Sequence, residues 1–290
     1  MPPTFDLQSH SIHSDGALPA ADVIAHAAAA GLQLVALTDH DTIDGVPEAR
    51  EAAARHGIGF TSAAELSAVH GGYEDLHICG YELDDADPDL QALLHDFRAD
   101  RARRIEAMAD RLRELGFELD DAPLKARRDA GKPIGRPHLA DAVLAHPGNA
   151  ARLAEEGIDG RDALFPPYLV PGAAAYVARS RPTVAQAIEV IHAAGGVAVW
   201  AHPFWDLDAV DETLATLATF AEAGLDGVEA FYATHDEEQT RILVEAAAEH
   251  GLLTTGSADF HGPEHERFNR FGAFELYGME PNLGPIGARG

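Results

Sequence analysis

Short apolar runs alternate along the chain with alanine-rich stretches of helical periodicity, and this alternation restricts the fold more than any other feature. After a first apolar pair near the start of the chain, the expected strands cover 32–37, 58–66, 75–83, 197–202, 226–232 and 252–260. The expected helices cover 20–30, 46–56, 89–116, 210–224 and 236–251. Strands that follow one another through helices pair in parallel, with right-handed crossovers. We therefore predict an α/β fold, a TIM-like (β/α) barrel of about seven strands.

One stretch of the chain breaks this rhythm. From about Asp120 to Arg181 the sequence is rich in proline, glycine and basic residues, as in KARRDAGKPIGRPH and FPPYLVPG, with short helical pieces such as 139–145. We interpret it as an inserted helical cap subdomain over the barrel mouth. The predicted domains are residues 1–119 for the first part of the barrel, 120–181 for the cap and 182–290 for the second part of the barrel.

The charge and the cysteine content exclude several classes of protein. The 290 residues carry a formal charge of −27, which argues against a long duplex nucleic acid as a partner. The first residues lack a basic segment followed by an apolar run, and no stretch approaches the roughly 18 apolar residues of a membrane span, so we expect a cytoplasmic protein without a membrane partner. Cys79 is the only cysteine, which excludes an intrachain disulfide, and its setting in LHICGY indicates a buried structural thiol.

Side chains that commonly bind metals lie at or near the end of every predicted strand. They are His10, Asp15, Asp39, His40, Glu65, His77, His202, Glu229, Asp259 and His261. In parallel barrels such side chains converge at the rim formed by the carboxyl ends of the strands. A single histidine in such a place commonly satisfies a backbone group or faces solvent, but that explanation would have to hold independently at every strand.

Imidazole and carboxylate together suit zinc, manganese or iron, whereas magnesium and calcium prefer oxygen ligands alone. The candidate ligands are too many for one ion, so we predict two or three divalent metal ions, with Glu65 as a bridging carboxylate. Clustered metals activate a water molecule and polarise a phosphoryl or carbonyl oxygen, and both effects favour hydrolysis. The sequence has no GxSxG motif that would indicate a serine nucleophile instead.

These residues stand in motifs that resemble the polymerase and histidinol phosphatase (PHP) family of metal-dependent phosphoesterases. The motifs are DLQSHSIHSDG, LTDHDT, AAELS, LHICGY, AHP and SADFH, which follow one another in the order of the family and cover the chain nearly end to end. The resemblance implies a distorted seven-stranded barrel with a trinuclear site for manganese, with iron or zinc as alternatives. The implied ligand sets are His10, Glu65 and Asp259 for one metal, Glu65, His77 and His202 for a second, and Asp15, His40 and His261 for a third.

One position departs from the family pattern. The family has a histidine where this chain has Gln8, so that an HxH pair has become Gln8-Ser9-His10. An amide oxygen coordinates metals more weakly than imidazole does, and we expect the first metal to be loosely held, selected differently or absent. His13 is an alternative ligand, but the loop would have to rearrange to bring it there.

Arginines give the only sequence indication of the substrate. Arg98, Arg101 and Arg104 follow one another at spacings of three, which places them on roughly one face of a helix. A second basic cluster in the predicted cap consists of Lys125, Arg127, Arg128, Lys132 and Arg136. Such residues often form only a solvated face paired with acids, but the arginine fork fits phosphate oxygens well. In so acidic a chain, two basic clusters favour a substrate with more than one phosphate.

Among the branches of the family, the chain most resembles the small phosphatases that remove the 3′-phosphate from nucleoside 3′,5′-bisphosphates, and relatives that trim short RNA from the 5′ end. The resemblance implies that Arg98, Arg101 and Arg104, together with Arg136 and His138, bind the second phosphate and the nucleotide. It also implies that His235 lies near the reacting phosphate, although a role as a helix-capping neighbour in a loop is the alternative.

We therefore predict a metal-dependent phosphoesterase that hydrolyses the 3′-phosphate of nucleoside 3′,5′-bisphosphates, with monophosphates as a further substrate class. The expected nucleophile is a hydroxide that bridges metals near Glu65, and His202, His235 or a metal-bound water would protonate the leaving group.

Three alternatives stay open. One is a 5′-3′ exonuclease on short RNA or DNA oligonucleotides, and another is a nucleotide- or metal-binding module whose catalysis is impaired by Gln8. The third is an amidohydrolase that acts on carbonyl substrates, in which the arginine stripe has no role.

Overall fold

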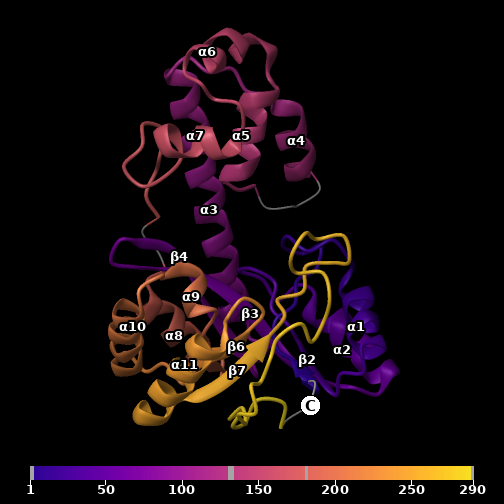
Figure 1. Cartoon of the computed structure of the whole chain (residues 1–290). Coiled ribbons are helices and arrows are strands. Elements are labelled where there is room, and N and C mark those ends of the chain that lie inside the picture. The colour runs from indigo at the N-terminus through magenta and orange to yellow at the C-terminus, as the bar shows by residue number, and fades with distance from the viewer. Residues whose placement is uncertain (1–2, 130–133, 180–181, 289–290) are drawn as a thin grey trace. The chain divides into compact units, whose positions relative to one another are not determined.

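The computed structural model describes residues 3–129, 134–179 and 182–288. The chain forms two compact units, Met1–His95 with Arg181–Gly290, and Asp96–Ser180 (Figure 1). The second unit starts inside a long helix, α3 (Pro88–Glu114), whereas the predicted insertion begins after that helix. That the second unit covers the barrel mouth stays a prediction.

The first unit contains a seven-stranded sheet in which each strand neighbours the next one along the chain. The strands are β1 (Phe5–Asp6), β2 (Leu34–Leu37), β3 (Gly59–His70), β4 (Tyr73–Tyr81), β5 (Val197–Trp200), β6 (Gly227–Tyr232) and β7 (Leu253–Ser257). Backbone hydrogen bonds join the two ends of the sheet, from Leu7 N to Gly256 O (3.2 Å) and from His10 N to Phe260 O (2.8 Å). The sheet therefore nearly closes into a barrel, and the predicted α/β barrel is confirmed.

The fourth strand differs from the prediction of a wholly parallel barrel, which is wrong here. β4 pairs antiparallel with both β3 and β5. Only Gly71 and Gly72 separate β3 from β4, and Gly71 has a left-handed φ of 56°. A two-residue turn has no room for a crossover helix, so the chain returns antiparallel. As a result, the N-terminal half of β4 lies at the same rim as the carboxyl half of β3.

Five amphipathic helices pack against this sheet in the first unit (Figure 1). They are α1 (Ala20–Ala29), α2 (Val46–His56), α8 (Val184–Ala193), α10 (Val210–Glu222) and α11 (Glu237–His250). Capping boxes start two of them, from Thr183 to Gln186 and from Asp236 to Gln239. Left-handed Gly57 and Gly251 end α2 and α11.

The second unit is helical and has a core of its own. It contains most of α3 together with α4 (Asp121–Asp129), α5 (Arg136–Ala145), the 3-10 helix η1 (Pro147–Asn149), α6 (Ala150–Glu155) and α7 (Arg161–Tyr168). Met108 and Leu112 of α3 are buried with Leu139, Val143 and Leu164. One face of α3 is therefore buried by residues of the second unit itself, which form a separate hydrophobic core.

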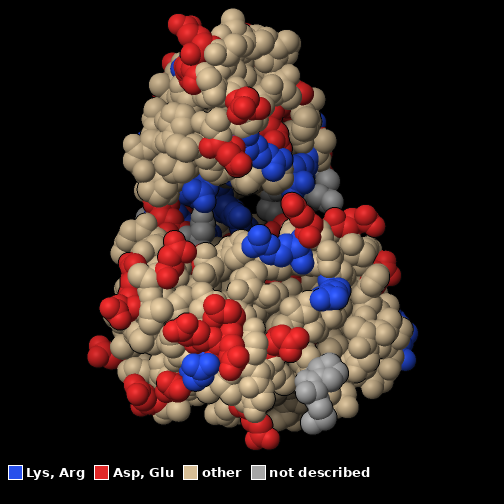
Figure 2. Space-filling model, viewed as in Figure 1, with Lys and Arg blue, Asp and Glu red and all other residues tan. Residues whose placement is uncertain are grey.

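The surface of the molecule carries both acidic and basic side chains. Figure 2 shows acidic side chains in separate groups scattered over the visible face, and fewer groups of basic side chains. Among the residues that the structure describes, no helix combines the length and the apolar character that a membrane span requires. Cys79 is buried within β4, and this burial raises the pKa of its thiol well above the ordinary value.

Candidate metal centre

The loop after β1 brings the first candidate ligands to the rim of the barrel. Its shape is fixed by Asp39, whose carboxylate accepts hydrogen bonds from Ser11 N and Ser11 Oγ (both 2.7 Å) and from Ser14 Oγ (2.7 Å). A Cβ atom at Gly16 would lie 2.1 Å from His10 O. The small residues of SHSIHSDG are therefore needed for the loop to fold back beside His10.

Glu65 lies at the centre of the site. Its side chain is 1% exposed, and four histidine nitrogens surround its two oxygens. His10 Nε2 and His40 Nδ1 lie 3.2 and 3.4 Å from Oε2, while His77 Nδ1 and His202 Nε2 lie 2.8 and 3.1 Å from Oε1. These histidines come from four different parts of the chain, and the antiparallel pairing places His77 of β4 opposite Ser67 of β3, two residues from Glu65.

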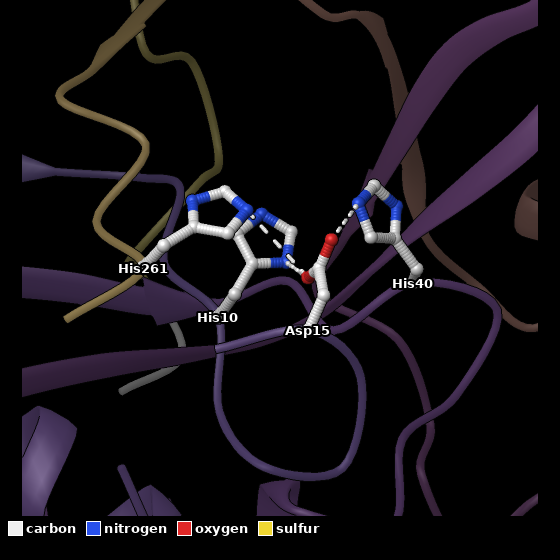
Figure 3. Close-up of side chains that lie close together, drawn as sticks. All are labelled: His10, Asp15, His40 and His261. Carbon is white, nitrogen blue, oxygen red and sulfur yellow. Dashed lines mark ion pairs between the residues drawn. The ribbon is translucent and has the colours of Figure 1, made fainter. Parts of the chain in front are cut away.

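Asp15 forms a second group with three histidines (Figure 3). Its carboxylate oxygens lie 3.6 Å from His10 Nδ1, 3.5 Å from His40 Nε2 and 3.5 Å from His261 Nε2. The rings of His10 and His261 stack with centroids 4.3 Å apart. Potential ligand atoms of these four residues all lie within 4.8 Å of one another, and the same holds for His40, Glu65 and His77.

Asp259 joins the two groups to β7. Its Oδ1 lies 3.0 Å from His10 Nε2, and its Oδ2 accepts a hydrogen bond from the hydroxyl of Tyr232 (2.8 Å). The residue has a left-handed φ of 55°, and the nearby His202 has a φ of 32°. Strained backbone of this kind is common where side chains are held for function.

The charges of the site depend on one another. Burial alone would raise the pKa of Glu65, but the surrounding histidines, first His40 and His77, hold it well below its ordinary value. Burial alone would lower the pKa of His202, but the Glu65 carboxylate raises it to about 9. The carboxylates likewise raise the pKa values of His10 and His77, so the site favours positive charge.

The donor set fits divalent cations. His10 Nε2, His40 Nδ1, His202 Nδ1 and Asp259 Oδ1 are buried and form no hydrogen bond of good geometry within the described part of the chain. Buried polar atoms rarely stay without partners. Imidazole nitrogens and carboxylate oxygens that face one another in this way are the ligands that manganese, iron and zinc accept.

Gln8 and Glu229 lie beside this cluster. Gln8 is fully buried, and its Nε2 donates to the two oxygens of Glu229 at 3.1 and 3.3 Å. Glu229 also accepts from Ser257 Oγ (2.6 Å) and from the backbone N–H of His202 (2.9 Å). Burial raises the pKa of Glu229 to about 7. From the sequence, Glu229 was predicted to lie near the end of a strand, and no role was assigned to it. In the structure its carboxylate accepts hydrogen bonds from Gln8, Ser257 and the backbone of His202.

His235 and His13 are two further histidines for which the sequence suggested a role in the site. His235 is buried, its Nδ1 lies 3.1 Å from Ala230 O, and burial lowers its pKa to about 4. His13 belongs to neither group of converging ligand atoms found in the described residues. The role of His235 near a phosphate stays a prediction.

The predicted substrate-binding residues other than His235 lie in the second unit. Arg104 is nearly buried and donates to Val177 O (2.6 Å) and to the Tyr176 hydroxyl (3.2 Å), so it also supports the fold of this unit. Arg98 and Arg101 are half-buried on α3. That these three arginines bind substrate stays a prediction.

The second basic cluster is partly engaged with neighbouring residues. Lys125 pairs with Asp129 and Arg128 pairs with Glu106, while Arg136 Nη1 lies 3.5 Å from Leu169 O. His138 Nδ1 accepts from Gly135 N (2.9 Å) at the start of α5. Lys132 lies outside the described residues. Phosphate binding by Arg136 and His138 likewise stays a prediction.

Known proteins share both the sequence pattern and the fold. Residues 6–96 match the family described as the PHP domain. The chain is 35% identical to a 3′,5′-nucleoside bisphosphate phosphatase from Chromobacterium violaceum, over 89% of this chain and 87% of that protein. It is 32% identical to a 5′-3′ exoribonuclease from Haemophilus influenzae, over 89% and 90%. A solved structure described as a metal-dependent phosphoesterase from Bifidobacterium adolescentis superposes with a TM-score of 0.72 at 29% identity, over 97% and 94% of the two chains.

Proposed function

Since the chain belongs to the PHP family and is a metal-dependent phosphoesterase, we propose that it removes the 3′-phosphate from nucleoside 3′,5′-bisphosphates, with nucleoside monophosphates as a second substrate class. The observation that carries this proposal is the arrangement of four histidine nitrogens within 2.8 to 3.4 Å of the oxygens of Glu65. The relative that is named for this reaction supports the choice of substrate.

The metal ligands of the proposed enzyme are the three ligand sets that the resemblance to the PHP family implies. They are His10, Glu65 and Asp259, then Glu65, His77 and His202, then Asp15, His40 and His261. Two or three ions, manganese before iron or zinc, belong to the proposal. When bound, such ions stabilise the charge that develops on phosphoryl oxygens and lower the pKa of a water molecule that attacks phosphorus.

The residues of the chain orient this chemistry. Asp39 holds the loop that carries His10 and Asp15, and the Tyr232 hydroxyl fixes the carboxylate of Asp259. His235 has a different character, because its Nδ1 lies within hydrogen-bonding distance of a backbone carbonyl and its pKa of about 4 keeps the ring neutral at pH 7. A neutral imidazole in this tautomer offers Nε2 as an acceptor. His235 Nε2 is buried and has no hydrogen-bond partner within the described residues, so it suits a hydrogen bond from an enclosed water molecule better than proton donation.

An aromatic group near the metal centre supports a nucleotide as the substrate. Trp205 lies on the short helix α9 (Pro203–Asp206) and is 47% exposed, although it is a large apolar side chain. The Arg267 guanidinium lies 5.3 Å from the centre of its ring, and Phe268 packs between Trp205 and the ligand His261, with ring centroids 5.6 and 5.7 Å away. Exposed aromatic rings commonly stack with bases.

A 5′-3′ exonuclease on short oligonucleotides is the second candidate, and the relative from Haemophilus influenzae favours it. The same metal centre would serve both reactions, since each is the hydrolysis of a phosphate ester. The products separate the two candidates, because an exonuclease releases mononucleotides from the 5′ end of an oligonucleotide, whereas the phosphatase releases inorganic phosphate.

The decisive experiment measures phosphate release with manganese from nucleoside 3′,5′-bisphosphates, nucleoside monophosphates and dinucleotides. We expect the bisphosphates to react fastest, and chelation of the metal to abolish the reaction. Equal rates on a non-nucleotide phosphate ester would contradict the assignment of a nucleotide substrate, and turnover that survives chelation would contradict the metal mechanism.

A further inference from the structure

Only one end of the Gln8 side-chain amide, its Nε2 atom, is held by hydrogen bonds with the described residues. Its side chain is fully buried, and its Nε2 donates to Glu229. Its Oε1 is also buried, but accepts no hydrogen bond from any residue that the structure describes. A buried amide oxygen without a partner is costly. This oxygen is therefore a candidate ligand for a cation.

Glu229 determines which end of the amide faces the metal centre. Its Oε1 accepts from Ser257 Oγ and its Oε2 from the backbone N–H of His202, at 2.6 and 2.9 Å. Gln8 Nε2 lies 3.3 and 3.1 Å from these two oxygens, where an N–H donor is favoured when Glu229 is ionised. If the amide were flipped, its carbonyl oxygen would face the carboxylate oxygens, so Nε2 stays on Glu229 and Oε1 points away from it.

The backbone places this oxygen next to the first ligand set. Phe260 N donates to Gln8 O (3.3 Å) and His10 N donates to Phe260 O (2.8 Å), so Gln8 lies beside the residue that follows Asp259. In an extended chain, residues two apart point to the same face. Gln8 therefore shares its face with His10, whose Nε2 lies 3.0 Å from Asp259 Oδ1, and both of these atoms also lack a good hydrogen bond within the described chain.

We propose that Glu229 is a positioning residue that holds Gln8 Oε1 as a ligand of the ion bound by His10, Glu65 and Asp259, and that this ligand set selects a harder cation at this position. The proposal rests on the metal centre of the proposed function. With Gln8, the four ligands of this ion are one imidazole nitrogen and three oxygens. With a histidine at position 8 they would be two imidazole nitrogens and two oxygens. Oxygen ligands suit manganese and magnesium, whereas imidazole suits zinc. The preference for zinc over manganese is therefore weaker at this position than it would be with a histidine at position 8.

The test measures metal binding directly. Protein stripped of metal is titrated with Mn²⁺ and with Zn²⁺ by calorimetry, and bound Mn²⁺ is followed by its paramagnetic resonance spectrum. We expect the Gln8→His variant to shift the ratio of zinc to manganese affinity at one position by about tenfold or more toward zinc. The Gln33→His variant is the matched control, because Gln33 is exposed and the added imidazole should leave the ratio unchanged.

A second pair of variants tests the positioning by Glu229. Loss of an outer partner commonly lowers metal affinity by about 10- to 100-fold, so we expect such a loss of Mn²⁺ affinity at one position in the Glu229→Gln variant. If that variant does not fold, the Gln8→Met variant removes the oxygen at a similar side-chain length and should show the same loss. Circular dichroism of the metal-free proteins reports the fold.

The outcomes separate this proposal from the proposed function. An unchanged ratio of zinc to manganese affinity in Gln8→His, or full Mn²⁺ affinity in both Glu229→Gln and Gln8→Met, would overturn it even if the enzyme hydrolyses nucleotides. Conversely, a shift in metal preference in a protein that releases no phosphate would support the ligand role of Gln8 and contradict the proposed function.

Discussion

Glu65 is the residue on which the candidate site depends most. It is a buried carboxylate with two histidine nitrogens near each of its oxygens. A carboxylate in this position can bridge two cations and balance their charge, which an amide cannot do because it offers one oxygen and no charge. The sequence predicted this bridging role from the place of Glu65 at the end of a strand.

The Glu65→Gln variant should therefore lose bound metal and activity together. We expect phosphate release to fall by at least about 100-fold, since even outer partners of metal ligands contribute 10- to 100-fold. Metal content by mass spectrometry and phosphate release are the measurements, and the exposed Glu245→Gln variant is the control. A Glu65→Gln protein with its full metal content and turnover would contradict the central role of Glu65.

Trp205 gives a prediction about the substrate. The Trp205→Ala variant should raise KM for nucleotides by about tenfold, since stacking on an aromatic side chain contributes about 1–3 kcal/mol per base. KM for a non-nucleotide phosphate ester should not change. The only other tryptophan, Trp200, is fully buried, so quenching of fluorescence by a nucleotide reports on Trp205 in the wild-type protein. Quenching that persists in the variant would exclude Trp205 as the stacking residue.

His235 gives a prediction about pH. Burial lowers its pKa to about 4 in the folded protein, whereas its ordinary value is 6.5. Between these values the unfolded chain binds one more proton than the folded chain, so the stability that depends on neutral His235 is lost as the pH falls from 6.5 to 4. The loss is about 3 kcal/mol. Chemical unfolding of the metal-free proteins should show that, between pH 6.5 and 4, the free energy of unfolding falls less steeply in the His235→Gln variant than in the wild-type protein. Parallel curves would contradict the buried neutral state.

At the scale of elements, the loop after β1 connects the fold with the site. Gly16 packs against the backbone of His10, where a Cβ atom would lie 2.1 Å from the carbonyl oxygen. Because this neighbour is backbone, the loop would have to shift and would carry His10 with it. This close approach could not be predicted from the sequence, because a glycine after Ser-Asp is also typical of an ordinary turn.

We expect the Gly16→Ala variant to lose metal affinity by about tenfold or more and to be destabilised by about 1–3 kcal/mol. Gly72→Ala is the matched control, because a Cβ atom at Gly72 meets no atom within 4 Å and should change stability by less than about 0.5 kcal/mol. Calorimetric metal titration and chemical unfolding measure the two effects. Equal behaviour of the two variants would show that the loop tolerates the added atom.

The strands show how far sequence reasoning reaches. The positions of six strands and of the candidate ligands near their ends follow from apolar runs and their polar neighbours, because burial in a barrel requires this pattern. The direction of β4 was missed, although Gly71 and Gly72 between two apolar runs are a hairpin signal. The role of Glu229 was also missed, because it depends on contacts with Gln8 and Ser257 that are 221 and 28 residues away in the sequence.

At the scale of the whole molecule, the net charge of −27 opposes the binding of an anionic substrate. Groups of acidic side chains are scattered over the visible face in Figure 2. Fields of this kind act over distances of about 30 Å at 0.01 M salt but only about 10 Å at 0.1 M. The charge of the molecule therefore affects substrate approach most at low ionic strength, and more for a longer oligonucleotide than for a mononucleotide.

The dependence of KM on salt consequently distinguishes two views of substrate binding. If the overall acidity dominates, KM for a short oligonucleotide at a fixed concentration of free metal should fall as the salt rises from about 0.01 to 0.1 M, because repulsion is screened. If the arginines of the second unit, such as Arg98 and Arg101, bind the phosphates, KM should rise with salt, as it does where cations neutralise a phosphate backbone. Because these arginines are predicted to bind phosphate, we expect KM to rise for the oligonucleotide and to change little for a small monophosphate. A fall in KM for the oligonucleotide would contradict this expectation and would show that repulsion by the overall charge dominates.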